Sequence, residues 1–251
     1  MLILSTLCAV IGGVTGMMAV HRGRRSRWTV VWMSLAFLAQ LGFLSIRGEA
    51  RQACPLVGIG EILVFLAWSL TLFYLLVGPP YRISLLGVFS APLVALFQAI
   101  ALIPGMLESS PDPVGGTTAW GETHAAMSVL GYGALALAAV AAVMFLVLDR
   151  LLKGHRLTSG LFRNLPPARE LLVSLRRLLW LGWSMLSVGV VAGFRMPHGE
   201  NALPHLISAT AVWIGYAVLL GILQFRGLTG RRLALLTVGF FVLSLSVFAL
   251  V

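Results

Sequence analysis

One uninterrupted apolar stretch decides the fold: THAAMSVLGYGALALAAVAAVMFLVL, residues 123–148. It contains no Asp, Glu, Lys or Arg. A helix needs about 20 apolar residues to cross the hydrocarbon core of a bilayer. Because lipid offers the backbone no hydrogen-bond partner, a single apolar stretch of this length is predicted to be a transmembrane helix.

The whole chain has the same apolar character. Of its 251 residues, 59% are hydrophobic and only 10% are charged, and the mean hydropathy is +0.97. Soluble domains carry about 25% charged residues, whereas disordered chains have much less apolar surface. The composition therefore excludes both classes, and it leaves little chain for a separate soluble catalytic domain.

Seven further apolar stretches accompany the first. We predict a single all-α transmembrane domain over residues 1–251, a bundle of eight transmembrane helices. The predicted helices cover about 2–20, 28–46, 56–78, 83–104, 123–148, 178–195, 205–224 and 233–251.

The basic residues predict how these helices are oriented. Fifteen of the 18 Lys and Arg lie in four loops, at 21–27, 79–82, 150–177 and 224–232. The positive-inside rule places these loops in the cytoplasm and both termini outside. The net charge of +10 then indicates contact with anionic lipid and not with nucleic acid. The second part of the longest basic loop, 167–177, is compatible with a short amphipathic helix on the inner leaflet.

No motif of a common catalytic site is present. Cys8 and Cys54 have neither CxxC spacing nor a following His, which excludes thioether haem attachment and a four-ligand zinc site within this chain. Walker A, GxSxG and HExxH motifs are also missing, and the acids show no paired spacing. We therefore predict that the chain is not itself an enzyme and has no catalytic residue.

Three histidines are predicted to lie at the outer face. His124 begins the fifth predicted helix, while His198 and His205 flank the loop RMPHGENALPH before the seventh. Helical spacing puts Ser128, Gly131 and Tyr132 on the face of His124, and it puts Ser208 and Tyr216 on the face of His205.

Two such faces at one depth would sandwich a flat macrocycle. Neutral imidazole is a good ligand for haem iron, and the nearby Arg195, Arg47 and Arg51 would pair with the propionates. The alternative is that these histidines only sit at the membrane interface, where an amphipathic ring needs no ligand.

Other residues indicate contacts between helices. Glu61 lies inside the third predicted helix, where an acid needs a partner, and Arg47 or Arg51 is the expected one. Gly189 and Gly193 follow helical spacing in the sixth, and small residues at this spacing let two backbones approach closely.

Three longer segments carry a family resemblance. They are CPLVGIGEILVFLAWSLTLFYLL at 54–76, the fifth helix quoted above, and LPHLISATAVWIGYAVLL at 203–220. In their order, spacing and loop charges they resemble the haem-handling cytochrome c assembly proteins, the CcsA, HemX and YpjD-like group. The tryptophan-rich loop of full CcsA relatives is replaced here by RMPHGENALPH.

This resemblance implies a multi-pass protein of the bacterial cytoplasmic membrane. It would hold or pass haem at the outer face in c-type cytochrome assembly, with other maturation proteins as partners. His124 matches the family's first outer histidine, a proposed axial ligand, and either His205 or His198 would be the second. The HemX relatives imply the alternative, a scaffold or regulator that binds a cytosolic partner through loop 150–177 without haem transfer.

Overall fold

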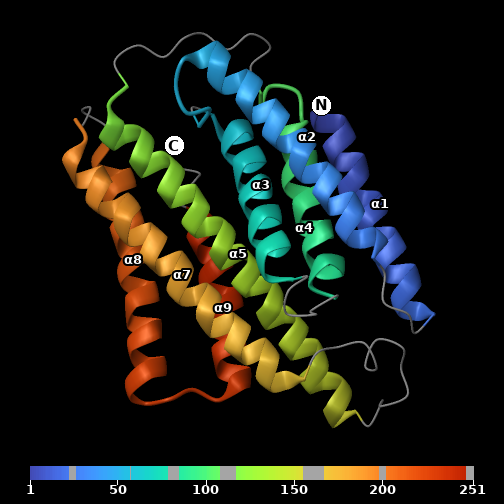
Figure 1. Ribbon diagram of the computed structural model, residues 1–251. Coiled ribbons are helices and arrows are strands. Elements are labelled where there is room, and N and C mark those ends of the chain that lie inside the picture. The colour runs from blue at the N-terminus through green and yellow to red at the C-terminus, as the bar shows by residue number, and fades with distance from the viewer. Residues whose placement is uncertain are drawn as a thin grey trace.

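The computed structural model describes residues 1–22, 27–56, 58–78, 85–107, 117–154, 167–197 and 202–246, the side chains of 202, 203 and 205 excepted. Within these ranges the chain forms eight helices and no strand (Figure 1). They are α1 Leu2–His21, α2 Trp28–Arg51, α3 Ile59–Val77, α4 Leu86–Ala101, α5 Ala119–Lys153, α7 Ala168–Arg195, α8 Ala202–Phe225 and α9 Gly230–Ser244. The prediction of an all-α fold is confirmed.

Six of these helices are long and apolar enough to cross a membrane: α1, α2, α3, α5, α7 and α8. Helix α4 is apolar but has 16 residues, and α9 has 15. Residues 79–84 and 247–251, which flank these two helices, lie outside the described ranges. The chain is therefore a multi-pass membrane protein.

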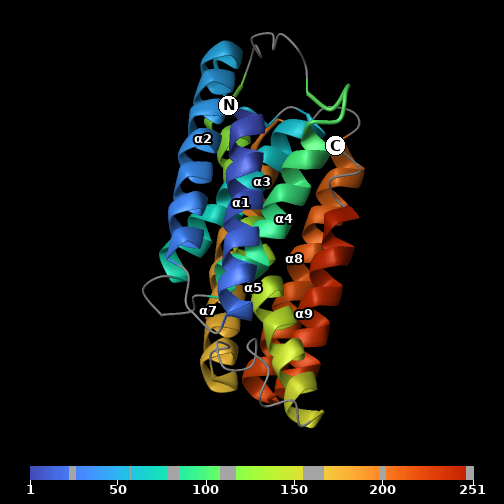
Figure 2. The same ribbon diagram turned by 90° about the vertical axis from the view of Figure 1, so that its right-hand side faces the viewer.

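Successive helices run in opposite directions, so α1 begins and α9 ends at the same end of the bundle (Figures 1 and 2). We call this the terminal end. The opposite end, here the basic end, carries Arg22, Arg150 and Lys153 together with the turn between α8 and α9. The loop charges predict that these basic residues lie at one end of the bundle. The acidic residues Glu49 and Glu122 lie at the terminal end.

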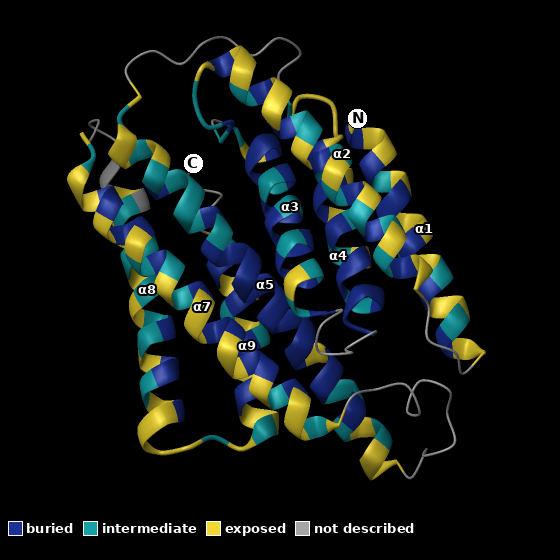
Figure 3. Cartoon of the chain, in the orientation of Figure 1, coloured by how far each residue is buried: buried dark blue, intermediate teal, exposed yellow. Residues whose placement is uncertain are grey.

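Helix α5 is the centre of the molecule. It packs against α3, α4, α7 and α9, and 83% of its most apolar stretch is buried, against 22% for α8. Figure 3 shows the same contrast along the two helices. Its Ala and Gly residues explain the position, because helices whose side chains are small can be approached closely from several sides.

The predicted surface helix at 167–177 is wrong as a separate element. Pro167 caps α7, which then runs without a break from Ala168 to Arg195. Leu171, Leu175 and Leu179 are fully buried. Since no Gly or Pro interrupts residues 168–181, the apolar stripe of the span continues into the loop segment and packs there.

Candidate functional site

The site with the most specific geometry lies where α5 begins, at the terminal end. The Thr118 hydroxyl accepts a hydrogen bond from the Gly121 N–H at 3.1 Å and so caps the helix. Glu122 stands in the first turn, where the helix dipole favours a negative charge. The cap places His124 in the second turn, one turn beyond Trp120.

The His124 imidazole is held against the backbone of α7. Its side chain is buried, with 9% of the residue exposed, and Nδ1 lies 2.8 Å from the Gly189 carbonyl oxygen. Because a carbonyl can only accept, this contact places the ring proton on Nδ1 and makes Nε2 the basic nitrogen. Histidines that bind metals are oriented in the same way, by donating their other N–H to a carbonyl or carboxylate.

Two glycines of α7 make this contact possible. A Cβ atom at Gly193 would lie 2.7 Å from His124 Nδ1, and one at Gly189 would lie 2.5 Å from the Ser128 Oγ. Both distances are below ordinary contact, so only glycine lets α7 come this close. The prediction that Gly189 and Gly193 mark a helix contact is confirmed.

Arg195 is the last residue of α7 and Trp120 lies in the first turn of α5, so both lie near His124 at the terminal end. The guanidinium carbon of Arg195 is 5.3 Å from the centroid of the Trp120 ring, a cation–π geometry. Arg195 is exposed, and it takes no part in the ion pairs between described residues. Sequence reasoning missed Trp120, although its spacing of four residues from His124 was available.

The other two predicted ligands are placed less completely. His198 lies outside the described residues, and His205 is described only by its backbone in the first turn of α8. Trp213 donates from Nε1 to the Ser187 Oγ at 2.8 Å, which sets the height of α8 against the antiparallel α7. On α8, His205 lies eight residues before Trp213, and on α7, Arg195 lies eight residues after Ser187. Each separation is about 12 Å of helix. The backbone of His205 is therefore level with Arg195.

The sandwich of a macrocycle between the fifth and seventh predicted helices stays a prediction. His124 lies against α7, the sixth of the predicted helices, which packs onto both α5 and α8. Tyr132 turns to α9 instead, where its hydroxyl donates to the Ser244 carbonyl at 3.2 Å. The glycines of α7 permit its close approach to His124 and Ser128 of α5.

Arg47 belongs to a separate charged cluster between α2 and α3. Its Nε donates to Glu61 at 2.9 Å, and the Nε of Arg51 donates to the same carboxylate at 3.0 Å. All three residues are buried. The prediction of a partner for Glu61 is confirmed, with both arginines serving.

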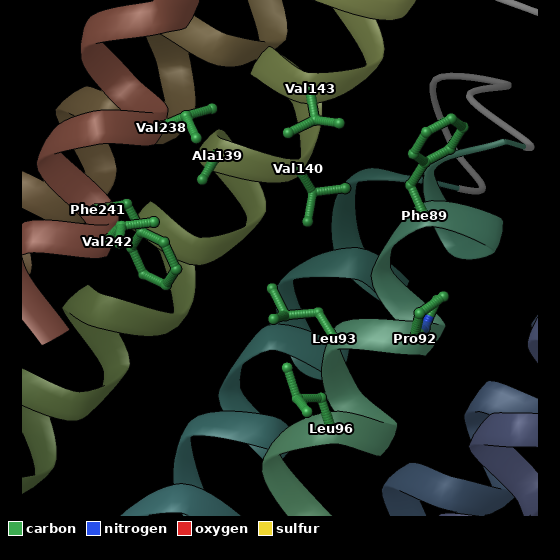
Figure 4. Close-up of a pocket in the computed structure, with 10 residues that line it drawn as sticks. All are labelled: Phe89, Pro92, Leu93, Leu96, Ala139, Val140, Val143, Val238, Phe241 and Val242. Atoms are coloured by element: carbon green, nitrogen blue, oxygen red, sulfur yellow. The ribbon is translucent and has the colours of Figure 1, made fainter.

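Described residues line a larger and a smaller pocket. The larger, about 370 Å³, opens between α4, α5 and α9, and every residue that lines it is apolar (Figure 4). It holds none of the predicted site residues. The smaller, about 140 Å³, lies at the terminal end between the α2–α3 connection and the start of α5, and Cys54, Thr118 and Glu122 line it.

Cys54 gives a testable property of this smaller pocket. Burial, together with the negative charges of Glu122 and Glu61, raises the pKa of its thiol from 9.0 to about 11. At pH 8 we expect Cys54 to be alkylated by iodoacetamide about 100-fold more slowly than a thiol of ordinary pKa, because only the thiolate reacts. The rate should rise as the pH approaches 11. The measurement uses Cys8→Ala protein, so that Cys54 is the remaining thiol.

Glu122→Gln provides the comparison for that measurement. It removes one of the two charges that raise the pKa, so it should speed alkylation at pH 8. Glu49→Gln, an exposed change on α2, should not. An alkylation rate at pH 8 equal to that of a free thiol would contradict the electrostatic description of the pocket.

Comparison with known proteins decides the family. Residues 56–250, from the α2–α3 connection through α9, match the family described as Cytochrome C assembly protein. The chain belongs to this family. His124, Arg195, His198 and His205 fall inside the matched region, whereas Arg47 precedes it.

Curated relatives agree with the family match. The cytochrome c biogenesis protein CcsA of Thermosynechococcus vestitus is 27% identical over 83% of this chain and 79% of its own length. CcsA of Chlamydomonas reinhardtii is 26% identical over 84% of this chain and 62% of its own length. CcsA of Crocosphaera subtropica is 30% identical over 53% of this chain and 42% of its own length. The similarity to CcsA confirms the resemblance seen in the sequence.

Proposed function

We propose that this protein takes part in c-type cytochrome assembly by holding or passing haem at the terminal end of the bundle. Membership of the Cytochrome C assembly protein family supports the process. The observation that supports the place is the buried imidazole of His124, whose Nδ1 proton is bound by the Gly189 carbonyl. The role is that of an accessory component, and we assign no catalytic residue to this chain.

Two described side chains and the position of one helix start support haem as the ligand. Haem supplies an iron centre that accepts a neutral imidazole as axial ligand. His124 presents Nε2 as the basic nitrogen, and Arg195 is an exposed cation beside it that suits a propionate. The backbone of His205 lies in the first turn of α8 at the height of Arg195, and we propose His205, or His198, as the second ligand. Arg47, whose Nε donates to Glu61, stays a proposed partner of a propionate.

We also propose the orientation. The basic end would face the cytoplasm of a bacterium, and the terminal end would face outward from the cytoplasmic membrane, with both termini outside. Haem would then be held on the side where c-type cytochromes are completed, and the other maturation proteins would approach from there. Arg150 and Lys153 would lie at the anionic inner leaflet.

The absorption spectrum of the detergent-purified protein tests this proposal, recorded as isolated and after addition of haem. We expect a Soret band shifted from that of free haem in the same detergent, because an imidazole has entered the coordination sphere. A spectrum identical to that of free haem at every protein concentration would reject haem binding. The scaffold alternative would then be favoured, and loss of positive charge in 150–177 would become the relevant variant.

A further inference from the structure

The first four helices carry a polar layer in their interior. Helices α1 to α4 pack against one another and bury one apolar cluster near the terminal end, made of Leu2, Leu44, Val64 and Ala101. One helical turn further in, each of these helices has a polar side chain on the same face. These are Ser5, three residues after Leu2; Gln40, four before Leu44; Trp68, four after Val64; and Gln98, three before Ala101.

Hydrogen bonds tie part of this layer together. The Gln98 Nε2 donates to the Ser5 Oγ at 2.7 Å, which links α4 to α1. The Ser5 Oγ donates to the Ala36 carbonyl at 3.1 Å, which links α1 to α2. Gln40 follows Ala36 by one helical turn, and Phe37 between them stacks on Trp68 of α3 with ring centroids 5.5 Å apart. All four helices thus meet at this depth.

Four polar atoms of the layer have no hydrogen-bond partner among the described residues. They are the Nε2 and Oε1 of Gln40, the Oε1 of Gln98 and the Nε1 of Trp68, and all are buried. Gln40 and Gln98 are 0% exposed. A buried donor or acceptor without a partner in hydrocarbon is unfavourable relative to one that is hydrogen-bonded. A dry layer would leave all four of these atoms unpaired, so a bound ligand that pairs with them lowers the free energy.

We propose that this layer is a binding site for ordered water inside the membrane domain. The unpartnered atoms comprise two donor nitrogens and two carbonyl oxygens, and none is charged. A neutral ligand that both donates and accepts satisfies this set, whereas a cation would be repelled by the N–H groups. Water meets this requirement, and a buried water typically makes about three hydrogen bonds. The site is separate from His124 and does not rest on haem binding.

Gln40→Met distinguishes a hydrated layer from a dry one. Met has nearly the volume of Gln, and Gln40 makes no direct side-chain hydrogen bond in the described structure, so the change removes only what a ligand would bind. If water bridges Gln40, the variant should lower the melting temperature of the detergent-solubilised protein by about 2–4 °C. If the layer is dry, removing an unsatisfied amide should raise it. Gln224→Met, an exposed Gln on α8, is the matched control and should cause no shift.

The indole of Trp68 provides an independent readout. In protein labelled with ¹⁵N at the tryptophan indoles, the Trp68 N–H should show a magnetisation-transfer cross-peak to water, although it is buried. Trp68→Phe assigns this resonance, and Gln40→Met should weaken the cross-peak. Either the absence of the cross-peak in the wild type or a melting temperature that stays equal or rises in Gln40→Met overturns the proposal.

Discussion

His124→Ala should abolish the haem Soret shift while the helical bundle stays intact. The variant removes the imidazole whose orientation the Gly189 carbonyl fixes, so no axial ligand remains on α5. Loss of an outer-shell partner of a metal ligand alone costs 10–100-fold in affinity. Removal of the ligand itself should therefore weaken haem retention by at least about 100-fold. Haem titration followed by absorption, with circular dichroism of the same samples, measures both properties.

His21→Ala is the matched control for this experiment. His21 ends α1 at the basic end and is exposed, so its loss should leave the titration unchanged. His205→Ala and His198→Ala, tested singly, assign the second ligand, since only one of them should reproduce the loss. Unchanged haem binding in folded His124→Ala would contradict the proposed site.

Glu61→Gln should be the most destabilising single change among the buried polar residues. Glu61 is 1% exposed and accepts hydrogen bonds from both Arg47 and Arg51, which are themselves 8% and 4% exposed. The amide would leave two buried guanidinium groups without their shared carboxylate. Breaking a buried ion pair in this way costs about 3–5 kcal/mol. Thermal unfolding in detergent should show a large drop in melting temperature.

Two variants show whether charge is the cause of that drop. Glu49→Gln removes an exposed acid from the same end of α2, where an unpaired surface carboxylate contributes little, so it should have almost no effect. Glu61→Asp keeps the charge on a shorter side chain and should retain part of the stability. Equal melting temperatures for Glu61→Gln and the wild type would mean that the cluster does not hold α2 to α3.

The charged contact between α2 and α3 could be predicted from the sequence. An acid inside an apolar span requires a cation, and Arg47 and Arg51 stand one helical turn apart, so the cluster with Glu61 follows from local spacing. The polar layer of the first four helices could not be predicted from local spacing. Ser5, Gln40, Trp68 and Gln98 lie on four different helices, and only their packing brings the four to one depth.

The amino-acid sequence by itself determined the class of protein, the existence of the helices and the polarity of the bundle. These properties depend on continuous segments alone, because the bilayer thickness sets the length of an apolar helix and the charges of the loops predict its orientation. It also marked His124 and the glycines of α7 as unusual residues. Tertiary structure alone decided that His124 meets Gly189 on α7 and not the seventh predicted helix. The choice of neighbour depends on how closely each pair of backbones can approach, and that is a property of two helix surfaces together, not of either segment alone.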